Sequence, residues 1–256
     1  MKKGTHREYE FIEPTGAEIE LRRSQIAIEA EVTLTVNGEV WLGFHCSPEN
    51  LDNLAVGFLH NESFIDSYDE VSSISVCKGL DNVDVWLNHP CEKPVTWKRT
   101  SGCQGGMSQK TGLGAQTKKH TETFLVSEIQ EQIKVFLTSL GQLGELRNGV
   151  HSTALLDGNK VVATSNDIGR HNTLDKIAGD CLRGKKLIMK PVLLTTGRIS
   201  SDMVLKAERM GVRLVISLHS ISSLAIETGT ILGMCLIGHA RSPKWGVYTH
   251  TEMIIY

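Results

Sequence analysis

The first candidate for chemistry is Cys103, which lies in the glycine-rich segment TSGCQGGMSQKTGLG. Three basic residues flank it, and nearby cations favour the nucleophilic thiolate form of a cysteine. Besides an incidental exposed thiol, four roles stay open: a protease or amidase nucleophile, a zinc ligand, a redox thiol or a persulfide carrier. A zinc ligand needs companions that are not nearby, and a thioredoxin-like pair needs a second cysteine where Gly106 stands. A persulfide carrier needs only one accessible, mobile thiol.

The other five cysteines are scattered along the chain, and the sequence contains no C-x-x-C pair. We therefore expect free thiols in a reducing compartment rather than disulfides. Cys77 and Cys235 stand among apolar residues, so we predict both to be small residues of a hydrophobic core.

A second candidate site consists of residues that follow three predicted buried strands. GRISSD follows PVLLTT, LHSISS follows VRLVIS, and HARSPKWG follows MCLIG. Parallel strands place their C-terminal ends on one edge of a sheet, so these three segments should meet there. Together they supply Gly197, Arg198, Ser200 or Ser201, His219, His239, Arg241 and Lys244. Helix N-termini, hydroxyls and cations favour anions, so this edge predicts a site for a phosphorylated ligand.

The segment NDIGRHNTLDK is the densest polar cluster of the chain, and two interpretations of it stay open. In the structural one, Asn172 or Thr173 caps a helix and Asp175 is a solvated charge. In the functional one, Arg170 and His171 stand at the start of a helix and hold a ligand or a partner.

Composition narrows the class of protein. The chain has 256 residues, of which 40% are hydrophobic and 22% are charged, as in an ordinary soluble enzyme. Its net charge of -2 argues against bulk nucleic-acid binding. No apolar run approaches the ~20 residues of a membrane span, and the N-terminus lacks the apolar region of a signal peptide. We therefore expect a cytosolic protein with neither nucleic-acid nor membrane partners.

The first hundred residues have mostly β patterns. Asn37-Gly38 separates two alternating runs and predicts a hairpin, because both residues tolerate a positive φ. Ser47 and Pro48 then have the residue types of an N-cap and a first helical position. The apolar stripe of this predicted helix consists of Leu51, Leu54, Ala55, Phe58 and Leu59. Two short strands should follow near residues 73–78 and 82–87.

Residues 88–119 form a long connection rich in Pro, Gly, Ser, Thr and Lys, a type of loop that is often functional. Helical periodicity resumes at SEIQEQIKVFLTSLG, where Ser127 and Gln130 have the spacing of a capping box. From residue 149 onward strand and helix patterns alternate, beginning with a predicted hairpin over Asp157-Gly158-Asn159. The strands and helices that follow predict a largely parallel, helix-covered sheet. We therefore predict an α/β fold, with α+β as the alternative. A β-rich domain should span 1–119 and end in the Cys103 loop, and an α/β domain that binds the ligand should span 120–256.

The chain resembles the FdhD family of formate dehydrogenase accessory proteins. The resemblance covers most of the chain and is carried, in the family's order, by SPENLDNLAVGFLHNE, TSGC, DIGRHNTLDKIAG, TTGRISSDMVLKAERMGV, SSLAIE and VYTH. It implies a sulfur carrier that accepts persulfide sulfur from a cysteine desulfurase. The sulfur then passes to the bis-molybdopterin guanine dinucleotide form of the molybdenum cofactor, which formate dehydrogenase receives. The resemblance also implies a cytidine deaminase-like C-terminal domain, a smaller N-terminal domain and a homodimer.

The resemblance assigns residues as well. Cys103 matches the first cysteine of the family's C-G-x-C-G loop and would carry the persulfide, whereas Gly106 replaces the second cysteine. The family's cofactor-binding stretch is matched by His239, Ala240, Arg241, Ser242, Pro243 and Lys244. Arg198, Arg241 and Lys244 would hold the phosphates of the cofactor. The other residues expected beside it are Gly197, Ser200, Arg170 and His171. No metal held by the protein itself is expected.

Two other functions stay open. Because Gly106 leaves the loop with one thiol, the chain could be a chaperone that delivers the cofactor without sulfur chemistry. A hydrolase would instead use Cys103 together with His151, His171 or His219. A zinc deaminase is disfavoured, since His151 begins the sequence His-Ser-Thr, which lacks the glutamate of H-x-E, and the chain has no P-C-x-x-C.

Overall fold

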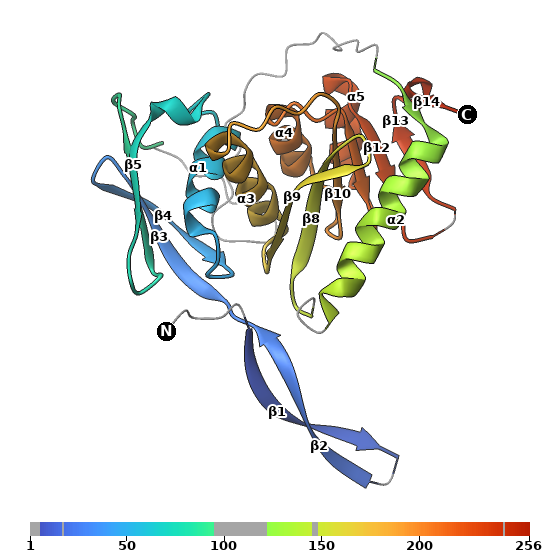
Figure 1. The fold of residues 1–256 in the computed structure, drawn as a ribbon, viewed down its shortest axis with the longest axis horizontal. Helices are drawn as coiled ribbons and strands as arrows, with labels where there is room; N and C mark the ends of the chain where they lie inside the picture. The colour runs from blue at the N-terminus through green and yellow to red at the C-terminus, as the bar shows by residue number, and fades with distance from the viewer. Residues whose placement is uncertain (1–5, 17, 95–121, 145–147, 243) are drawn as a thin grey trace.

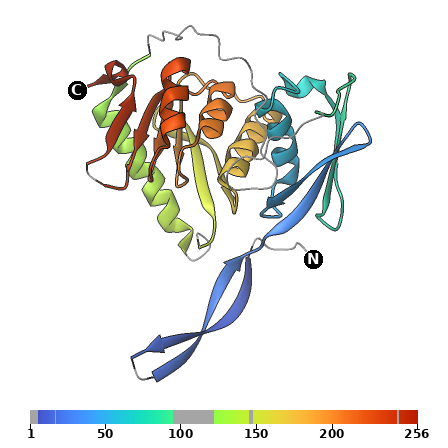
Figure 2. The ribbon, with the colours of Figure 1, turned by 180° about the vertical axis from the view of Figure 1, so that it is seen from behind.

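The structure, a computed structural model, describes residues 6–16, 18–94, 122–144, 148–242 and 244–256. In these residues two β-sheets lie on either side of a pair of packed helices, and a long hairpin extends away from both (Figure 1, and from behind in Figure 2). None of the helices in these ranges is long and apolar enough to span a membrane. The predicted boundary between two domains at 119 and 120 lies outside the described residues and stays a prediction.

The larger sheet has six strands in the order β13-β12-β11-β10-β8-β9. They are β8 (His151–Asp157), β9 (Lys160–Asp167), β10 (Pro191–Thr195), β11 (Leu214–Ser217), β12 (Cys235–Gly238) and β13 (Gly246–Thr249). β10, β11 and β12 are parallel, whereas β8 pairs antiparallel with both of its neighbours and β13 pairs antiparallel with β12. The predicted parallel order is therefore right for the three central strands. The predicted hairpin over Asp157-Gly158-Asn159 is confirmed and forms the antiparallel edge of β8 and β9, because two residues are too few to cross between parallel strands.

Helices cover both faces of this sheet, which confirms the predicted α/β class. They are α2 (Val126–Gln142), α3 (Arg170–Arg183), α4 (Ser201–Arg209) and α5 (Ser223–Leu232). Leu155 and Leu193 pack with α3, α4 and α5 on one face, and Leu156 and Leu194 pack with α2 on the other. A short parallel pair, β7 (Phe124–Leu125) and β14 (Ile254–Ile255), joins the α2 side.

The predicted helix starts agree only in part with the structure. Ser200 and Ser222 are the N-caps of α4 and α5, and the Ser222 hydroxyl accepts a hydrogen bond from the Ala225 amide. Ser127 lies inside the first turn of α2, whose N-cap is Leu125, so the predicted capping box is wrong. The strand β7 ends at Leu125 and fixes the start of the helix two residues earlier than the Ser127 pattern indicates.

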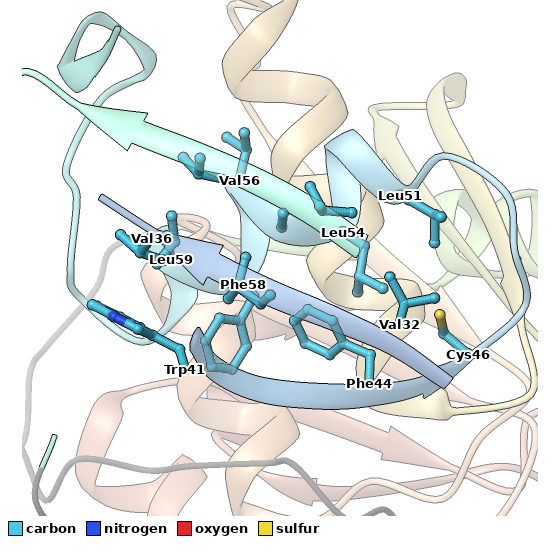
Figure 3. Close-up of a cluster of buried hydrophobic side chains, with 14 of the residues drawn as sticks. Val32, Val36, Trp41, Phe44, Cys46, Leu51, Leu54, Val56, Phe58 and Leu59 are labelled. Carbon is cyan, nitrogen blue, oxygen red and sulfur yellow. The ribbon is translucent and has the colours of Figure 1, made fainter. Parts of the chain in front are cut away.

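The smaller sheet has four strands in the order β4-β3-β6-β5 and is covered on one face by a helix. Its elements are β3 (Ala30–Val36), β4 (Glu39–Cys46), β5 (Val71–Val76), β6 (Asn82–Leu87) and the covering helix α1 (Leu51–Asn61). Asn37 and Gly38 have φ angles of 50° and 82°, which confirms the predicted hairpin. Figure 3 shows the apolar stripe of α1 against these strands, where the rings of Phe44 and Phe58 meet edge to face at 5.3 Å.

The helix α1 begins at Leu51, with Asn50 as its N-cap, and not just after Ser47 as the sequence pattern predicts. Ser47 is engaged elsewhere. Its amide donates to the Asp167 carboxylate at 3.1 Å, and its hydroxyl accepts from the Ile168 amide at 3.3 Å. A tertiary contact thus replaces the predicted cap.

α1 and α3 pack so closely that their main chains touch. A Cβ atom at Gly57 of α1 would lie 1.7 Å from the Asp175 carbonyl oxygen. A Cβ atom at Gly179 of α3 would lie 2.0 Å from the Asn53 carbonyl oxygen. Only glycine fits at either position, and this pair of contacts joins the smaller sheet and its helix to the larger sheet.

Buried charges lie beside this helix contact. Lys206 of α4 is 3% exposed and forms ion pairs with Asp175 at 2.8 Å and with Glu62 at 2.9 Å, while Asn61 donates to Asp175 at 2.8 Å. Burial acts to lower the pKa of Lys206, but the two carboxylates outweigh it and raise the pKa above its usual value. Asp175 is buried and paired, so the interpretation that makes it a solvated charge is wrong.

The hairpin consists of β1 (His6–Thr15) and β2 (Glu18–Ala27), which pair antiparallel over their whole length. It leaves the body of the molecule and extends into solvent (Figure 1). At its base Ala27 lies beside the loop that precedes β8, since a Cβ atom at Gly149 would be 3.5 Å from the Ala27 Cβ. The hairpin therefore starts at the end of the larger sheet where β8 begins.

Gly57→Ala should lower the free energy of unfolding by about 3 kcal/mol, because the new methyl group would overlap a main-chain carbonyl that cannot move alone. Urea unfolding followed by circular dichroism measures this change. The control is Gly141→Ala in α2, where a Cβ meets nothing within 4 Å. It should stabilise the chain by about 0.5–1 kcal/mol. Equal stability of the two variants would contradict a close helix contact at Gly57.

Candidate functional site

The loops after β10, β11 and β12 are joined by main-chain hydrogen bonds at one edge of the larger sheet, here called the strand-end edge. The Ile199 amide donates to Ser220 at 3.1 Å, and the Ser222 amide donates to Ile199 at 3.0 Å. The third loop joins through His239, whose amide donates to the His219 carbonyl at 2.8 Å. The three polar segments singled out in the sequence therefore lie side by side.

Several backbone amides at the strand-end edge already have partners inside the chain. The Gly197 amide donates to the Thr195 hydroxyl at 3.0 Å, and the Ser217 hydroxyl donates to the Gly197 carbonyl at 2.7 Å. The amides of His219 and Ala240 both donate to Ser217, at 2.9 Å each. These bonds lock the loops together. Attraction for an anion must then come mainly from side-chain cations rather than from these amides.

Two arginines and two histidines gather at this edge. Gly197 lies so close to the start of α3 that a Cβ there would be 2.9 Å from the Arg170 Cβ. Burial, followed by the charges of Arg170 and His219, lowers the pKa of His151, and Arg198 acts in the same direction. The charges of Arg170 and Arg198 make the local potential at this edge positive, which suits a phosphate group.

His151 reaches this edge because of the direction of its strand. β8 runs antiparallel to β10, with Thr153 opposite Thr195, so the start of β8 lies beside the end of β10. The sequence suggested His151 only as a base for a hydrolase. The short turn Gly158-Asn159 makes β8 and β9 antiparallel, but no sequence signal shows that β8 is the strand that pairs with β10.

His171 is buried where α3 meets the start of α4. Its Nε2 lies 3.3 Å from the Ser200 Oγ, and its Nδ1 has no hydrogen-bond partner in the described part of the chain. Burial, followed by the charges of Arg170 and Lys206, lowers the pKa of His171 to about 3. The ring is therefore neutral at neutral pH and a weak base, which argues against His171 as the base of a hydrolase.

Part of the polar segment NDIGRHNTLDK forms a buried network. Asp167 is fully buried and accepts hydrogen bonds from Lys176 at 2.6 Å and from Asn172 at 2.8 Å. Asn172 also donates to the His45 carbonyl at 2.9 Å, and Lys176 donates to the Ser47 carbonyl at 3.0 Å. These bonds tie the turn between β9 and α3 to the smaller sheet.

The rest of the segment points to the functional interpretation. α3 begins at Arg170 with Gly169 as its N-cap, so the prediction that Asn172 or Thr173 caps a helix is wrong. The buried network holds the turn that carries Arg170 and His171 to the strand-end edge. The structural interpretation is therefore wrong in both of its parts, and the functional interpretation of Arg170 and His171 stays a prediction.

The stretch that the resemblance assigns to cofactor binding follows β12. Its exposed residues are His239, Arg241, Ser242 and Lys244. Ala240 is buried, and Pro243 lies outside the described residues. The Ser242 amide donates to the His239 carbonyl at 2.9 Å and closes a tight turn. The two cations of this stretch are therefore accessible to a ligand.

Cys103 and Gly106 lie outside the described residues, so the role of their loop stays a prediction. Other thiols of the chain have poor surroundings for a nucleophile. Burial raises the pKa of Cys181 to about 11 and that of Cys235 to about 12, and it also raises the pKa of Cys91. A raised pKa leaves little thiolate at neutral pH.

Cys235 is a buried core residue as predicted, but Cys77 is not. Cys77 is half-buried next to the turn between β5 and β6, where its thiol donates to the Asp81 carboxylate at 2.7 Å. Its sulfur also accepts from the Asn82 amide at 3.2 Å.

In the ranges that the structure covers, no three His, Cys, Asp or Glu side chains are grouped to hold a metal ion.

Comparison with known proteins identifies the family. The model of the FdhD/NarQ family matches residues 27–255. The chain belongs to the FdhD/NarQ family. The resemblance found in the sequence is thereby confirmed, and it spans both sheets.

Relatives in this family have nearly the same length as the chain. The sulfur carrier protein FdhD of Bacillus subtilis is 32% identical over 246 residues, which cover 93% of each chain. That of Geobacillus kaustophilus is 31% identical over 245 residues, which cover 90% of each chain. The crystal structure of a candidate formate dehydrogenase accessory protein from Desulfotalea psychrophila superimposes with a TM-score of 0.82 at 24% identity. It covers 98% of this chain and 100% of its own, so the two proteins share the whole fold.

His171→Gln should flatten the acid side of the stability profile. The pKa of His171 is about 3 in the folded chain and 6.5 when unfolded, so below pH 6.5 the unfolded state binds the extra proton. This contribution to stability is complete above pH 6.5. It falls by up to about 1.4 kcal/mol per pH unit as the pH drops toward the folded pKa. Urea unfolding at several pH values between about 4 and 7 should show a smaller loss in the variant. Parallel profiles would contradict a buried neutral histidine.

Proposed function

We propose that the chain is a sulfur carrier that serves formate dehydrogenase. Family membership carries this proposal: relatives of nearly equal length, matched over 90% of the chain or more, are named sulfur carrier proteins. The strand-end edge supports it, because a carrier that acts on a large phosphorylated cofactor needs a positive surface to hold it.

The proposed sulfur donor is a cysteine desulfurase. The Cys103 thiolate attacks the outer sulfur of the donor's persulfide, the S–S bond of the donor breaks, and the donor cysteine leaves as a thiolate. Cys103 then carries the persulfide. The raised pKa values of Cys91, Cys181 and Cys235 support this choice, since they make those thiols poor nucleophiles.

The proposed acceptor is the bis-molybdopterin guanine dinucleotide molybdenum cofactor, bound as a substrate. Each guanosine end of this cofactor carries a pyrophosphate, and the exposed cations Arg198, Arg241 and Lys244 suit such groups. Arg170 adjoins them at Gly197. When the sulfur passes on, the cofactor supplies the electron pair for its new bond to the outer sulfur, the bond between Cys103 and that sulfur breaks, and Cys103 leaves as a thiolate. Formate dehydrogenase then receives the cofactor.

The proposal includes a cytoplasmic location and a homodimer. The five described cysteines are all free thiols, which supports a reducing compartment. A sulfur carrier with a single loop thiol also needs such a compartment, because oxidation would block the thiol that accepts the sulfur.

Cys103→Ala should abolish sulfur loading. The intact protein is incubated with a cysteine desulfurase and cysteine and then weighed by mass spectrometry. The parent chain should gain the mass of one sulfur atom, and the variant should gain none, because no other thiol takes its place.

Cys77→Ala is the matched control, since it removes a half-buried thiol outside the proposed loop and should load like the parent. Equal loading of the parent and Cys103→Ala would make the assignment of Cys103 wrong.

Gly106 favours the cofactor chaperone as a second function. Undiminished formate dehydrogenase activity in cells with Cys103→Ala would select that function.

Arg198→Gln should weaken the binding of guanosine diphosphate, a probe for one end of the cofactor, by about tenfold, because one charge-assisted contact to phosphate is lost. Titration calorimetry measures the affinity. Lys134→Gln on α2 is the control, since this lysine is 75% exposed in its side chain and lies outside the strand-end edge. The same affinity in both variants would count against this edge as the nucleotide site.

A further inference from the structure

The hairpin of β1 and β2 carries apolar side chains that no other described element covers. These are Tyr9, Phe11, Ile12, Ile19, Leu21 and Ile26, with exposed fractions from 43% to 72%. The register places Ile12 directly opposite Leu21, and Ile19 lies on the same face two residues before Leu21. A two-stranded hairpin alone is marginally stable in water, so a further contact is expected to support it.

The two outer edges of the hairpin differ in what they can bind. In the described residues the hairpin forms a sheet of its own, so each strand has one unpaired edge. Pro14 interrupts β1, because proline has no amide hydrogen to donate to a neighbouring strand. β2 has no proline, and its ten residues can pair with another extended strand.

The sequence of β2 is complementary to itself. Leu21 is the one residue of this strand with opposite charges on its two sides, Glu20 before it and Arg22 after it. If two copies of β2 pair antiparallel with their two-fold axis at Leu21, each Glu20 faces an Arg22 of the other copy, and Leu21 faces Leu21. With the axis at Glu20 or at Arg22 instead, two like charges would face each other at the centre of the interface.

We propose that this chain dimerises through the outer edge of β2, which pairs antiparallel with β2 of a second copy about an axis at Leu21. The result is a four-stranded sheet built from two hairpins. This inference specifies the interface of the homodimer in the proposed function, but it depends on neither Cys103 nor sulfur transfer.

Main-chain bonds and apolar contacts supply the affinity of this interface, and the charges select its register. Arg22 already forms an ion pair with Glu13 at 2.6 Å, and its side chain is 53% exposed, so a further pair at this surface adds little energy. On the other face, Leu21 of one copy meets Leu21 of the other at the axis, and Ile19 of each copy faces Arg23 of the other. A strand of another protein could use the same edge, and a second β2 supplies the matching charge on both sides of Leu21.

The proposed interface and the candidate site lie on the same side of the molecule. The base of the hairpin at Ala27 adjoins Gly149, two residues before His151 at the strand-end edge. Figure 1 shows the hairpin leaving the body at the end of the sheet where β8 begins. The two copies would therefore join on the side of the molecule that carries the candidate site.

Leu21→Lys tests the axis, because it places two ammonium groups opposite each other at the centre of the interface. Sedimentation equilibrium of the full chain over a concentration series should show a dimer for the parent, and for the variant a dissociation constant weaker by about tenfold or more. Ile12→Lys is the matched control. It changes an equally exposed residue on the same face of the hairpin but away from the outer edge of β2, and it should remain dimeric.

Charge exchange tests the register. Glu20→Arg and Arg22→Glu should each weaken the dimer, since each places like charges opposite one another at two positions. An equal mixture of the two variants should form a heterodimer, because every pair across the axis is then of opposite charge. The side chains changed are exposed, so circular dichroism should show the same fold in every variant.

A parent that is monomeric up to about 100 µM would overturn the proposal. So would a dimer that none of the β2 variants weakens, or one that Ile12→Lys weakens as much as Leu21→Lys, which would indicate face-to-face packing instead. Sulfur loading of Cys103 is measured separately by mass, so failure of the dimer interface and failure of the proposed sulfur chemistry are distinguishable.

Discussion

Main-chain contact between α1 and α3 is the constraint on which the rest of the molecule depends. Gly57 and Gly179 let the helices approach until backbone atoms touch, so no side chain can adjust the spacing. α1 carries the core of the smaller sheet and α3 carries one core of the larger sheet, so their contact fixes one sheet against the other. α3 also begins at Arg170, so the helix that sets the packing also positions the start of the candidate site.

The charged side chains of the molecule fall into two sets, one buried in ion pairs and one exposed at the strand-end edge. Inside, Lys176 and Lys206 each lie within hydrogen-bond distance of a carboxylate, and both ammonium groups are almost completely shielded from solvent. Such pairs hold elements together and have no charge left for a ligand. At the strand-end edge, Arg198 and its neighbours are exposed and can attract an anion. The motif NDIGRHNTLDK contributes residues both to the buried charge pairs and to the strand-end edge. Its residue types alone therefore did not reveal its role.

The sequence predicts those features that depend on neighbouring residues. Asn37-Gly38 specifies its hairpin locally, and the apolar strands of the larger sheet are visible as continuous runs. Ser47 misleads because its partner, Asp167, lies 120 residues away. The convergence of the three polar loops follows from parallel strands, whereas the bonds that occupy their amides depend on side-chain positions such as that of the Ser217 hydroxyl. The proposed role of Cys103 depends on the family pattern more than on its local sequence.

The cluster around Lys206 bears on how this family can diverge. Lys206, Asp175 and Glu62 come from α4, α3 and the end of α1, and one ammonium group faces two carboxylates where all three side chains are almost fully buried. Loss of Lys206 leaves two carboxylates buried without their cation and costs about 3–5 kcal/mol, whereas joint replacement of all three by apolar residues of similar volume can be neutral. A change of Lys206 alone is therefore expected to be more damaging than a change of all three positions together. We expect relatives to keep Lys206 together with its two carboxylates or to replace all three.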